Sequence, residues 1–349
     1  MNHASIDRRQ YLRIALATGT VWTLPQELFA AENLVAVTFP GTFHDAHRAI
    51  LVPHFKKGTG ADVTLTTQLA VDVISKLAAA GAGKPPFDIA MLDEGPLLDG
   101  VKQGLFAEYP VAQSANWKDL HPTFQDKWGP KVTMQAVGIG YNPKRVKNPP
   151  RSWDDLWKPE FKGRVGLTAL NSSLGVAFLA EIARLRGGGE TNIEPAFKAL
   201  RELLPNVGAI SANLGAHATL FQQEQVDIAP HNFNFVENLR SKGVNLEFVV
   251  PETGAVGWRT SLHIAKHAAN HKLAAQYIES HLVPDVQSEM QKAPYWIIPT
   301  NSKVGLAGPV QEKLGKTMAD LGKIRFQDWA AINERRGAWI ERFNREIRT

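Results

Sequence analysis

The sequence predicts an α/β fold with a parallel sheet, in a chain long enough for two domains. Residues 33–104 alternate between β-branched, apolar segments and segments with helical spacing, in the order strand, helix, strand, helix, strand, helix. That alternation favours parallel strands joined by right-handed crossovers. The length of 349 residues, 44% of them hydrophobic, provides enough apolar surface for two cores of ordinary size.

The first part of the chain predicts three strands, each followed by a helix. Strands are expected where β-branched and apolar residues run together, and helices where apolar residues recur at three- and four-residue intervals. Glycines at 58, 60 and 104 end two of the helices. The expected strands are 33–39, 61–67 and 87–92, and the expected helices are 47–57, 72–80 and 96–103.

Residues 131–141 alternate between side-chain types and predict a long strand. Gly138 and Gly140 in this strand are spaced as in a nucleotide-binding loop, but Asn142 and Pro143 turn the chain where such a loop needs a helix. The spacing therefore does not predict a dinucleotide site. A short helix is expected next, with Ser152 as its N-cap and Asp155 as the partner in a capping box.

The second part of the chain continues the alternation of helices and strands. No internal repeat or low-complexity tract interrupts it. The expected helices are 175–186, 194–204, 213–223 and 272–282, and the expected strands are 244–250 and 257–264.

Residues 1–31 predict an export signal of the twin-arginine type. Arg8 and Arg9 precede an apolar stretch over 14–24, which at 11 residues is too short to span a bilayer. Small residues at Ala30 and Ala31 suit a cleavage site, so we expect the mature protein in the periplasm. The alternative is an amphipathic N-terminal helix of a cytosolic enzyme.

Composition excludes several classes of function. The formal net charge is +5, but the basic residues are scattered, so no nucleic-acid partner is expected. The chain has no cysteine, which excludes disulfides, thiolate nucleophiles and cysteine-based metal sites. His44, His47 and His54 could suggest a zinc site, but on a helix that spacing is common by chance and no second shell of Asp or Glu is evident, so neither a metal nor a cofactor is expected.

Five segments, in this order, resemble the extracellular solute-binding proteins that serve ABC importers, in the branch that carries polyamines, ferric iron, thiamine or aminophosphonates. They are FDIAML (87–92), VGIGYNP (137–143), SWDDLWKPEFKGRV (152–165), PETGAVGW (251–258) and YIESHLVPDVQ (277–287). The resemblance implies a two-lobed type II periplasmic-binding-protein fold, with the ligand cleft between lobes joined by crossover strands. It assigns residues 32–137 to lobe 1, 138–258 to lobe 2, and 259–349 to the rest of lobe 1 and the C-terminal helices.

The resemblance also implies a function. The chain is expected to be the periplasmic substrate-binding component of an ABC importer, capturing a small polar solute by hinge closure, without catalysis. The expected partners are the solute and the permease and ATPase complex; membrane contact is through the permease alone, and the protein is monomeric. The alternatives are a periplasmic ligand-sensing receptor and, less favoured, an enzyme, for which no G-x-S-x-G, P-loop or H-E-x-x-H motif is present.

The candidate ligand residues lie where predicted strands end, because ligands of open α/β sheets bind at the carboxyl ends of strands. For single Ser and Asn residues, the alternative is a role as a helix cap or turn residue. Trp258 and Arg259 correspond to a ligand position of the family. The expected ligand-binding residues are Thr42, Phe43, Gln68, Asp93, Glu94, Tyr141, Asn171, Ser172, Ser173, Asn213, Asn232, Asn234, Trp258 and Arg259.

Arg259 separates this chain from the polyamine carriers it resembles, which place a carboxylate just after the tryptophan. A guanidinium attracts an anion, whereas Asp93 and Glu94 suit an amine, so an anionic or zwitterionic ligand is expected. The iron carriers of the same branch use adjacent tyrosines. The five tyrosines of this chain include no adjacent pair, which disfavours iron.

Overall fold

The computed structural model describes residues 33–348. The predicted export signal lies outside the described residues and stays a prediction. Among the residues described, no helix is long and apolar enough to cross a membrane.

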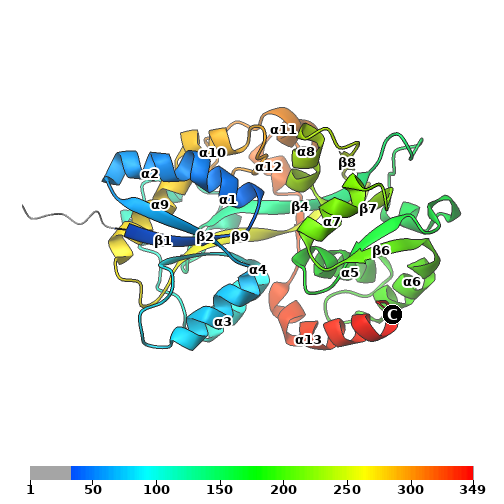
Figure 1. Cartoon of the computed structure of the whole chain (residues 1–349), viewed down its shortest axis with the longest axis horizontal. Helices are drawn as coiled ribbons and strands as arrows, with labels where there is room; N and C mark the ends of the chain where they lie inside the picture. Colours follow the sequence, from blue (N-terminus) through cyan, green and yellow to red (C-terminus); the bar gives the residue numbers. More distant parts are fainter. Residues whose placement is uncertain (1–32, 349) are drawn as a thin grey trace, which may run out of the picture. The chain divides into compact units, whose positions relative to one another are not determined.

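Strands and helices alternate along most of the chain (Figure 1). The strands are β1 (Asn33–Thr38), β2 (Asp62–Thr67), β3 (Ile89–Asp93), β4 (Lys131–Tyr141), β5 (Val165–Thr168), β6 (Val207–Ser211), β7 (Ile228–Asn232), β8 (Glu247–Val249), β9 (Val256–Ile264) and β10 (Arg325–Phe326). The α-helices are α1 (Thr42–Ala46), α2 (Val52–Thr59), α3 (Ala70–Ala80), α4 (Glu94–Lys102), α5 (Ser173–Leu185), α6 (Glu194–Leu203), α7 (Leu214–Gln222), α8 (Phe233–Ser241), α9 (His271–Leu282), α10 (Pro284–Met290), α11 (Gly308–Leu314), α12 (Met318–Leu321) and α13 (Trp329–Glu346). A π-helix, η1 (His47–Leu51), joins α1 to α2. The 3₁₀ helices are η2 (Val111–Gln113), η3 (Trp117–Asp119), η4 (Pro122–Phe124), η5 (Trp153–Trp157), η6 (Pro159–Phe161) and η7 (Leu204–Asn206).

The strands form one mixed sheet in the order β2-β1-β3-β9-β4-β7-β5-β6, with β10 added to β9 and β8 to β4. The strands β2, β1 and β3 are parallel to one another, as are β7, β5 and β6. Between these two sets, β9 and β4 run antiparallel to their neighbours. The predicted α/β fold is confirmed, and each half of the sheet has the parallel strands that helical crossovers favour.

The long strands β4 and β9 belong to both halves of the sheet. β9 pairs with β4 over residues 256–261 and with β3 over residues 260–264. β4 pairs with β9 through its first half and with β7 and β8 through its second half. These are the strands expected to cross between the lobes.

Two hydrophobic cores lie along the sheet. The first gathers residues of β1 and β3, such as Val37 and Ile89, and the second gathers Val137, Leu167 and Phe197. Helix α13, one of the C-terminal helices of residues 259–349, contributes Trp339 and Phe343 to the second core. The lobe boundaries themselves stay a prediction.

Gly138 has a packing role rather than a nucleotide-binding one. A Cβ at this position would lie 2.4 Å from the carbonyl oxygen of Val249 and 2.7 Å from the ring of Phe248, both in β8. A hydrogen atom is therefore all that fits where β8 pairs with β4.

The capping box at residues 152–155 is present, and it opens the 3₁₀ helix η5. The Ser152 hydroxyl accepts from the backbone N–H of Asp154 at 3.2 Å, and the Asp155 carboxylate accepts from that of Ser152 at 3.1 Å. The sequence signal for this helix start is confirmed.

Histidines that the zinc hypothesis considered have other partners. His44 Nδ1 lies 3.1 Å from the Thr38 hydroxyl, and His47 Nδ1 lies 2.9 Å from the Tyr277 hydroxyl. The described part of the chain contains no group of three or more His, Asp or Glu residues arranged to hold a metal ion.

Several histidines are buried in their neutral form. Burial lowers the pKa of His217 and of His281 to about 4, and that of His263 to about 3. In the unfolded chain, these groups regain a pKa near 6.5. Between pH 6.5 and about 4 the unfolded chain therefore binds more protons than the folded one, so the free energy of unfolding falls as the pH falls.

We predict that His281→Phe makes stability less sensitive to acid. Neither ring nitrogen of His281 has a hydrogen-bond partner within residues 33–348, so an aromatic ring without nitrogens fits the same chemistry. Loss of one titrating group should reduce the slope of unfolding free energy against pH by about 1.4 kcal/mol per pH unit between pH 6 and 4.5. Urea unfolding at a series of pH values measures this slope. His54→Gln, at an exposed position, is the control, and equal slopes in the two variants would contradict the prediction.

Candidate functional site

The carboxyl ends of β3 and β7 approach the same stretch of β9 and β4 from opposite directions. Asp93, the last residue of β3, lies opposite Thr260, and Asn232, the last residue of β7, lies opposite Val137. Val137 in turn lies opposite Val256. The ends of two strands from different halves of the sheet are thus separated by a few residues of β9.

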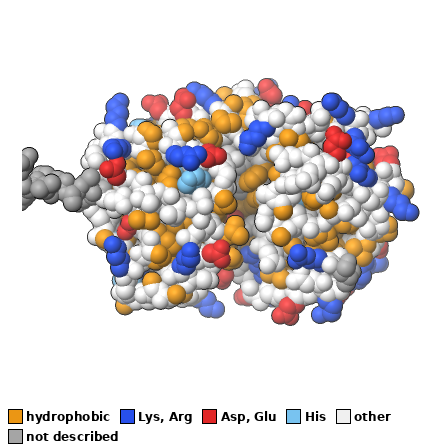
Figure 2. Space-filling model, viewed as in Figure 1, with side chains coloured by type: hydrophobic (Ala, Val, Ile, Leu, Met, Phe, Trp, Pro, Cys, Tyr) orange, Lys and Arg blue, Asp and Glu red, His pale blue; other side chains and the backbone are white. Residues whose placement is uncertain are grey.

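A helix follows each strand of the two parallel sets. Helices α1, α3 and α4 follow β1, β2 and β3, and helices α5, α7 and α8 follow β5, β6 and β7. Helix N-termini carry partial positive charge and unpaired N–H groups. Figure 2 shows a furrow between the two halves of the described chain, with hydrophobic side chains in it.

The Asp93 carboxylate joins the two halves. One oxygen accepts a hydrogen bond from the Thr260 hydroxyl at 2.9 Å, and the other accepts from the Ser173 hydroxyl at 3.1 Å. Thr260 lies in β9, whereas Ser173 is the first residue of α5 in the other half. A carboxylate at a helix N-terminus is favoured by the helix dipole, so this contact stabilises the approach of α5 to β3.

Burial raises the pKa of the Asp93 carboxyl to about 6, while the hydrogen bonds of Thr260 and Ser173 act in the opposite direction. The Trp258 indole also acts on this carboxylate. Its N–H, however, reaches hydrogen-bond geometry with no acceptor in residues 33–348, so the side-chain donors to Asp93 are the two hydroxyls. An ammonium group of a solute placed here would favour the ionised form.

Trp258 and Arg259 point to opposite faces of β9, because side chains alternate along a strand. Trp258 shares its face with Thr260 and lies with its ring centroid 6.4 Å from that of Trp329 in α13. Arg259 lies on the other face, over the ring of Phe326 at 4.0 Å. The two residues expected to contact one ligand together are therefore separated by the strand.

Arg259 is paired within the chain. Its backbone N–H donates to Glu94 at 2.9 Å, and its guanidinium forms an ion pair with the other oxygen of the same carboxylate. The side chains are 21% and 12% exposed, so the pair is mostly shielded from water. Asp93 and Glu94, expected to act together, have different partners: Asp93 accepts from hydroxyls and Glu94 holds Arg259.

Asn232 lies fully buried at the end of β7 and donates from its amide nitrogen to Gln135 at 2.9 Å. Gln135 is opposite Trp258 in the sheet, so this amide pair lies on the same face as Trp258 and Asp93. The side-chain oxygen of Asn232 and the side-chain nitrogen of Asn234 are buried and have no partner among the described residues. Polar atoms of this kind can bind a solute.

Two of the expected residues cap helices, and a third lies in the loop before α5. Ser172 caps α5 by accepting from the N–H of Leu174, and Asn213 caps α7 by accepting from that of Ala216 at 2.9 Å. Asn171 is exposed, and its carbonyl accepts a hydrogen bond from Arg336. Ser172 and Asn213 therefore act as helix caps, which is the alternative role considered for them.

The expected residues near α1 and α3 have different roles: some pack in the core, and one has a buried polar atom without a partner. Phe43 is 3% exposed and packs edge-on against Phe39 in the first core, which is a structural role. Thr42 is buried at the start of α1. Gln68 donates its backbone N–H to Thr38, and its side-chain oxygen is buried without a partner in the described part of the chain.

Tyr141 lies away from this group of residues. It pairs with Ile228 at the start of β7, whereas Asn232 at the end of β7 pairs with Val137. Four residues of strand separate the two positions, which is about 13 Å. Burial raises the pKa of Tyr141, and Glu247 and Arg240 are its charged neighbours. The structure does not bring Tyr141 to the other expected ligand residues.

The expectations from sequence omitted Thr260, Gln135, Trp329 and Arg336. Two of these had a usable signal, because Thr260 stands two residues after Trp258 and Gln135 lies within the predicted long strand. Trp329 and Arg336 reach the site from the C-terminal helix, and no local pattern indicates that contact.

A cavity of about 430 Å³ lies elsewhere, at the ends of α3 and α4. Its lining includes Leu77, Gln103 and Lys266, and none of the expected ligand residues. It lacks a buried polar group without a partner among the described residues, so we assign the site to the strand ends instead.

Residues 84–335 match a family model described as bacterial extracellular solute-binding protein. The chain belongs to this family. Members bind solutes and are not enzymes, which confirms the family resemblance and the expectation of a non-enzymatic protein. The family description also agrees with a protein that acts outside the cytoplasm.

Similar proteins support the assignment. The spermidine/putrescine-binding periplasmic protein of Escherichia coli is 26% identical over 297 residues, 80% of this chain and 82% of that protein. A putative extracellular solute-binding protein from Bordetella parapertussis superposes with a TM-score of 0.76 at 20% identity, covering 91% and 99% of the two chains. The periplasmic binding protein AfuA from Actinobacillus pleuropneumoniae, with fructose-6-phosphate bound, gives 0.73 at 20% identity over 91% and 99%. The fold is that of periplasmic binding proteins.

We predict that Glu94→Ala lowers the free energy of unfolding by about 2 kcal/mol, since it leaves the shielded Arg259 charge without its partner. The double variant Glu94→Ala with Arg259→Leu should lose less than the sum of the two single variants. Urea unfolding measures all three.

The control is Glu252→Ala, which removes one partner of the exposed Arg151–Glu252 pair. Its effect should stay within about 0.5 kcal/mol. If Glu94→Ala matched this control, the pair would not contribute to stability.

Proposed function

We propose that this protein is the substrate-binding component of an ABC importer and closes over a small polar solute between the two halves of its sheet. The observation that supports this most directly is the Asp93 carboxylate, which accepts hydrogen bonds from Thr260 in one half and from Ser173 in the other. A solute bound beside Asp93 contacts both halves, so its binding energy favours their closed arrangement.

The proposal extends to location and partners. The mature protein acts in the periplasm as a monomer after removal of residues 1–31, and delivers the solute to a permease and ATPase complex. Relatives described as periplasmic support the location. The proposed lobes keep the division expected from the sequence, with residues 32–137 and part of 259–349 in one lobe and residues 138–258 in the other.

We infer an anionic or zwitterionic solute from the charges around the site. Asp93 and Glu94 are balanced by Arg259 and by Arg336, which lies close enough to Asp93 to act on it. The helix N-termini at the strand ends add partial positive charge and N–H donors. An amine of the solute would face Asp93, and an acidic group would face the start of α5.

Polyamines are the second candidate. The E. coli relatives are described as binding spermidine and putrescine, or putrescine. Asp93 is available to an ammonium group, because its carboxylate forms no ion pair with a Lys or Arg of the described residues, whereas Glu94 does. Against this candidate, Glu94 is already occupied by Arg259, which leaves one carboxylate for a ligand with two or more ammonium groups.

A thermal-shift screen of residues 32–349 tests the proposed function. The panel holds putrescine, spermidine, thiamine, aminoethylphosphonate, amino acids and small carboxylates. A solute at about 1,000 times its Kd should add about 4 kcal/mol of stability, which raises the midpoint by several degrees. A binder whose effect disappears in Asp93→Asn supports the site, with the exposed Asp72→Asn as control. A binder unaffected by Asp93→Asn would place the solute elsewhere.

Glu94→Gln distinguishes the two solute classes. The substitution removes the charge that neutralises Arg259, yet keeps an oxygen that can accept from its backbone N–H. Affinity for an anionic or zwitterionic solute should then rise about tenfold, and that for a polyamine should fall. Isothermal titration calorimetry measures both, with Glu252→Gln as the control. Unchanged affinity in both cases would mean that the Arg259–Glu94 pair does not act on the solute.

A further inference from the structure

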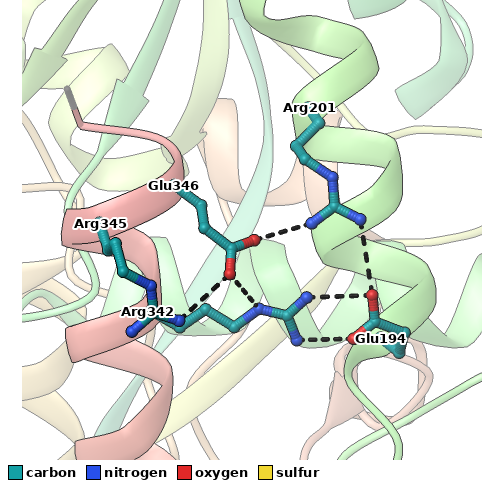
Figure 3. A network of polar contacts seen from close by, with 5 residues as sticks. All are labelled: Glu194, Arg201, Arg342, Arg345 and Glu346. Carbon is teal, nitrogen blue, oxygen red and sulfur yellow. Dashed lines mark hydrogen bonds and ion pairs between the residues drawn. The ribbon is translucent and has the colours of Figure 1, made fainter.

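Helix α13 is anchored to the half of the molecule that contains α6. Arg342 donates two hydrogen bonds to Glu194, at 2.6 and 3.0 Å, and one to Glu346 at 2.9 Å (Figure 3). Arg201 of α6 donates to Glu346 at 2.7 Å. Arg342 also lies over the ring of Phe197 at 4.1 Å, so charge and packing hold the end of α13 to α6.

The start of α13 reaches the other half, at the beginning of α4. Asn333 donates from its side-chain nitrogen to the carbonyl oxygen of Gly95 at 2.7 Å. The contact is close, because a Cβ on Gly95 would lie 3.0 Å from the Trp329 ring and 3.1 Å from the Asn333 side-chain oxygen. Asn333 and Trp329 thus contact α4 at Gly95, which directly follows Glu94 and stands two residues after Asp93.

Between these two contacts, Arg336 holds the loop before α5. Its guanidinium donates to the carbonyl oxygens of Leu170, at 3.2 Å, and of Asn171, at 2.9 Å. Arg336 forms no ion pair with a carboxylate of residues 33–348, although Asp93 and Asp99 lie close enough to stabilise its charge. This loop leads directly to Ser173, the partner of Asp93.

We propose that α13 is a brace between the two halves, in which Asn333 and Arg336 are positioning residues of the solute site. Asn333 holds the start of α4, which follows Asp93, and Arg336 holds the loop that leads to Ser173. Both residues stand on one rigid helix anchored at α6, so they set the distance over which Asp93 and Ser173 meet. The inference rests on the proposed closure around a solute, and it assigns the brace to residues outside the expected ligand set.

A distance measurement that needs no solute tests the brace. The chain has no cysteine, so Lys76→Cys in α3 and Lys198→Cys in α6, both exposed, give a unique pair of spin labels. Double electron–electron resonance should give one narrow distribution of the distance between the two labels in the parent. Asn333→Ala, Arg336→Ala and Gly95→Ala should each broaden it and shift its mean by several ångström.

Arg335→Ala is the matched control, because the hydrogen bonds and the ion pair of this neighbouring arginine within the described residues go to Ala331 and Glu334 of its own helix. Its distance population should equal that of the parent. Circular dichroism checks that each variant is folded. If Arg336→Ala unfolds the protein, Gly95→Ala still tests the brace, because it changes the contact between α4 and α13 from the α4 side.

Two results would overturn the proposal. One is the same distance population in the parent, Asn333→Ala and Gly95→Ala; the other is a broad population already present in the parent. A further readout is affinity for spermidine or aminoethylphosphonate, whichever binds the parent, and the brace variants should bind it about tenfold more weakly. Failure of both solutes to bind would count against the proposed function and leave the distance result to judge the brace.

Discussion

The antiparallel pairing of β4 with β9 is the constraint on which the site depends. These two strands carry the hydrogen bonds that join a parallel set of strands on either side. Because β3 and β7 pair with them in opposite directions, the carboxyl ends of both strands arrive at the same few residues of β9. A slip of β4 against β9 would move the Asp93–Thr260 contact away from the Asn232–Gln135 contact, and a slip of one residue would place the two contacts on opposite faces of the sheet.

Next to this pairing, the charged side chains have partners that the sequence did not predict. Two adjacent acids, Asp93 and Glu94, separate because Asp93 ends a strand and Glu94 begins a helix. Asp93 accepts from hydroxyls on both halves, and Glu94 binds the arginine on the opposite face of β9. The ion pair limits what Arg259 can offer to a solute, since a new anion must compete with a carboxylate already in place. The closing of the two halves is therefore tied to Asp93 more than to Arg259.

Local patterns were sufficient where a side chain acts on its own segment. The capping box of Ser152 and Asp155 and the strand over 131–141 could be predicted because their signals lie within a few residues. Strands β5 and β6 could not, because Val165–Thr168 and Val207–Ser211 are short and become strands through pairing with each other. Tyr141 was expected at the site because it ends a strand, yet β7 runs antiparallel to that strand and places its own end at Val137.

The sequence by itself determined the α/β class, the order of most elements and the family, because periodicity and motifs are local properties. It also placed Asp93, Ser173 and Asn232 at strand or helix ends and Trp258 on the return strand, and in the structure Asp93, Asn232 and Trp258 share one face of the sheet while Ser173 donates to Asp93. Only the tertiary structure decided that Arg259 faces the other way and pairs with Glu94. It also decided that Asn333 and Arg336 contact α4 and the loop before α5. These contacts join residues more than 160 positions apart, and nothing in the neighbouring sequence of either partner specifies the other.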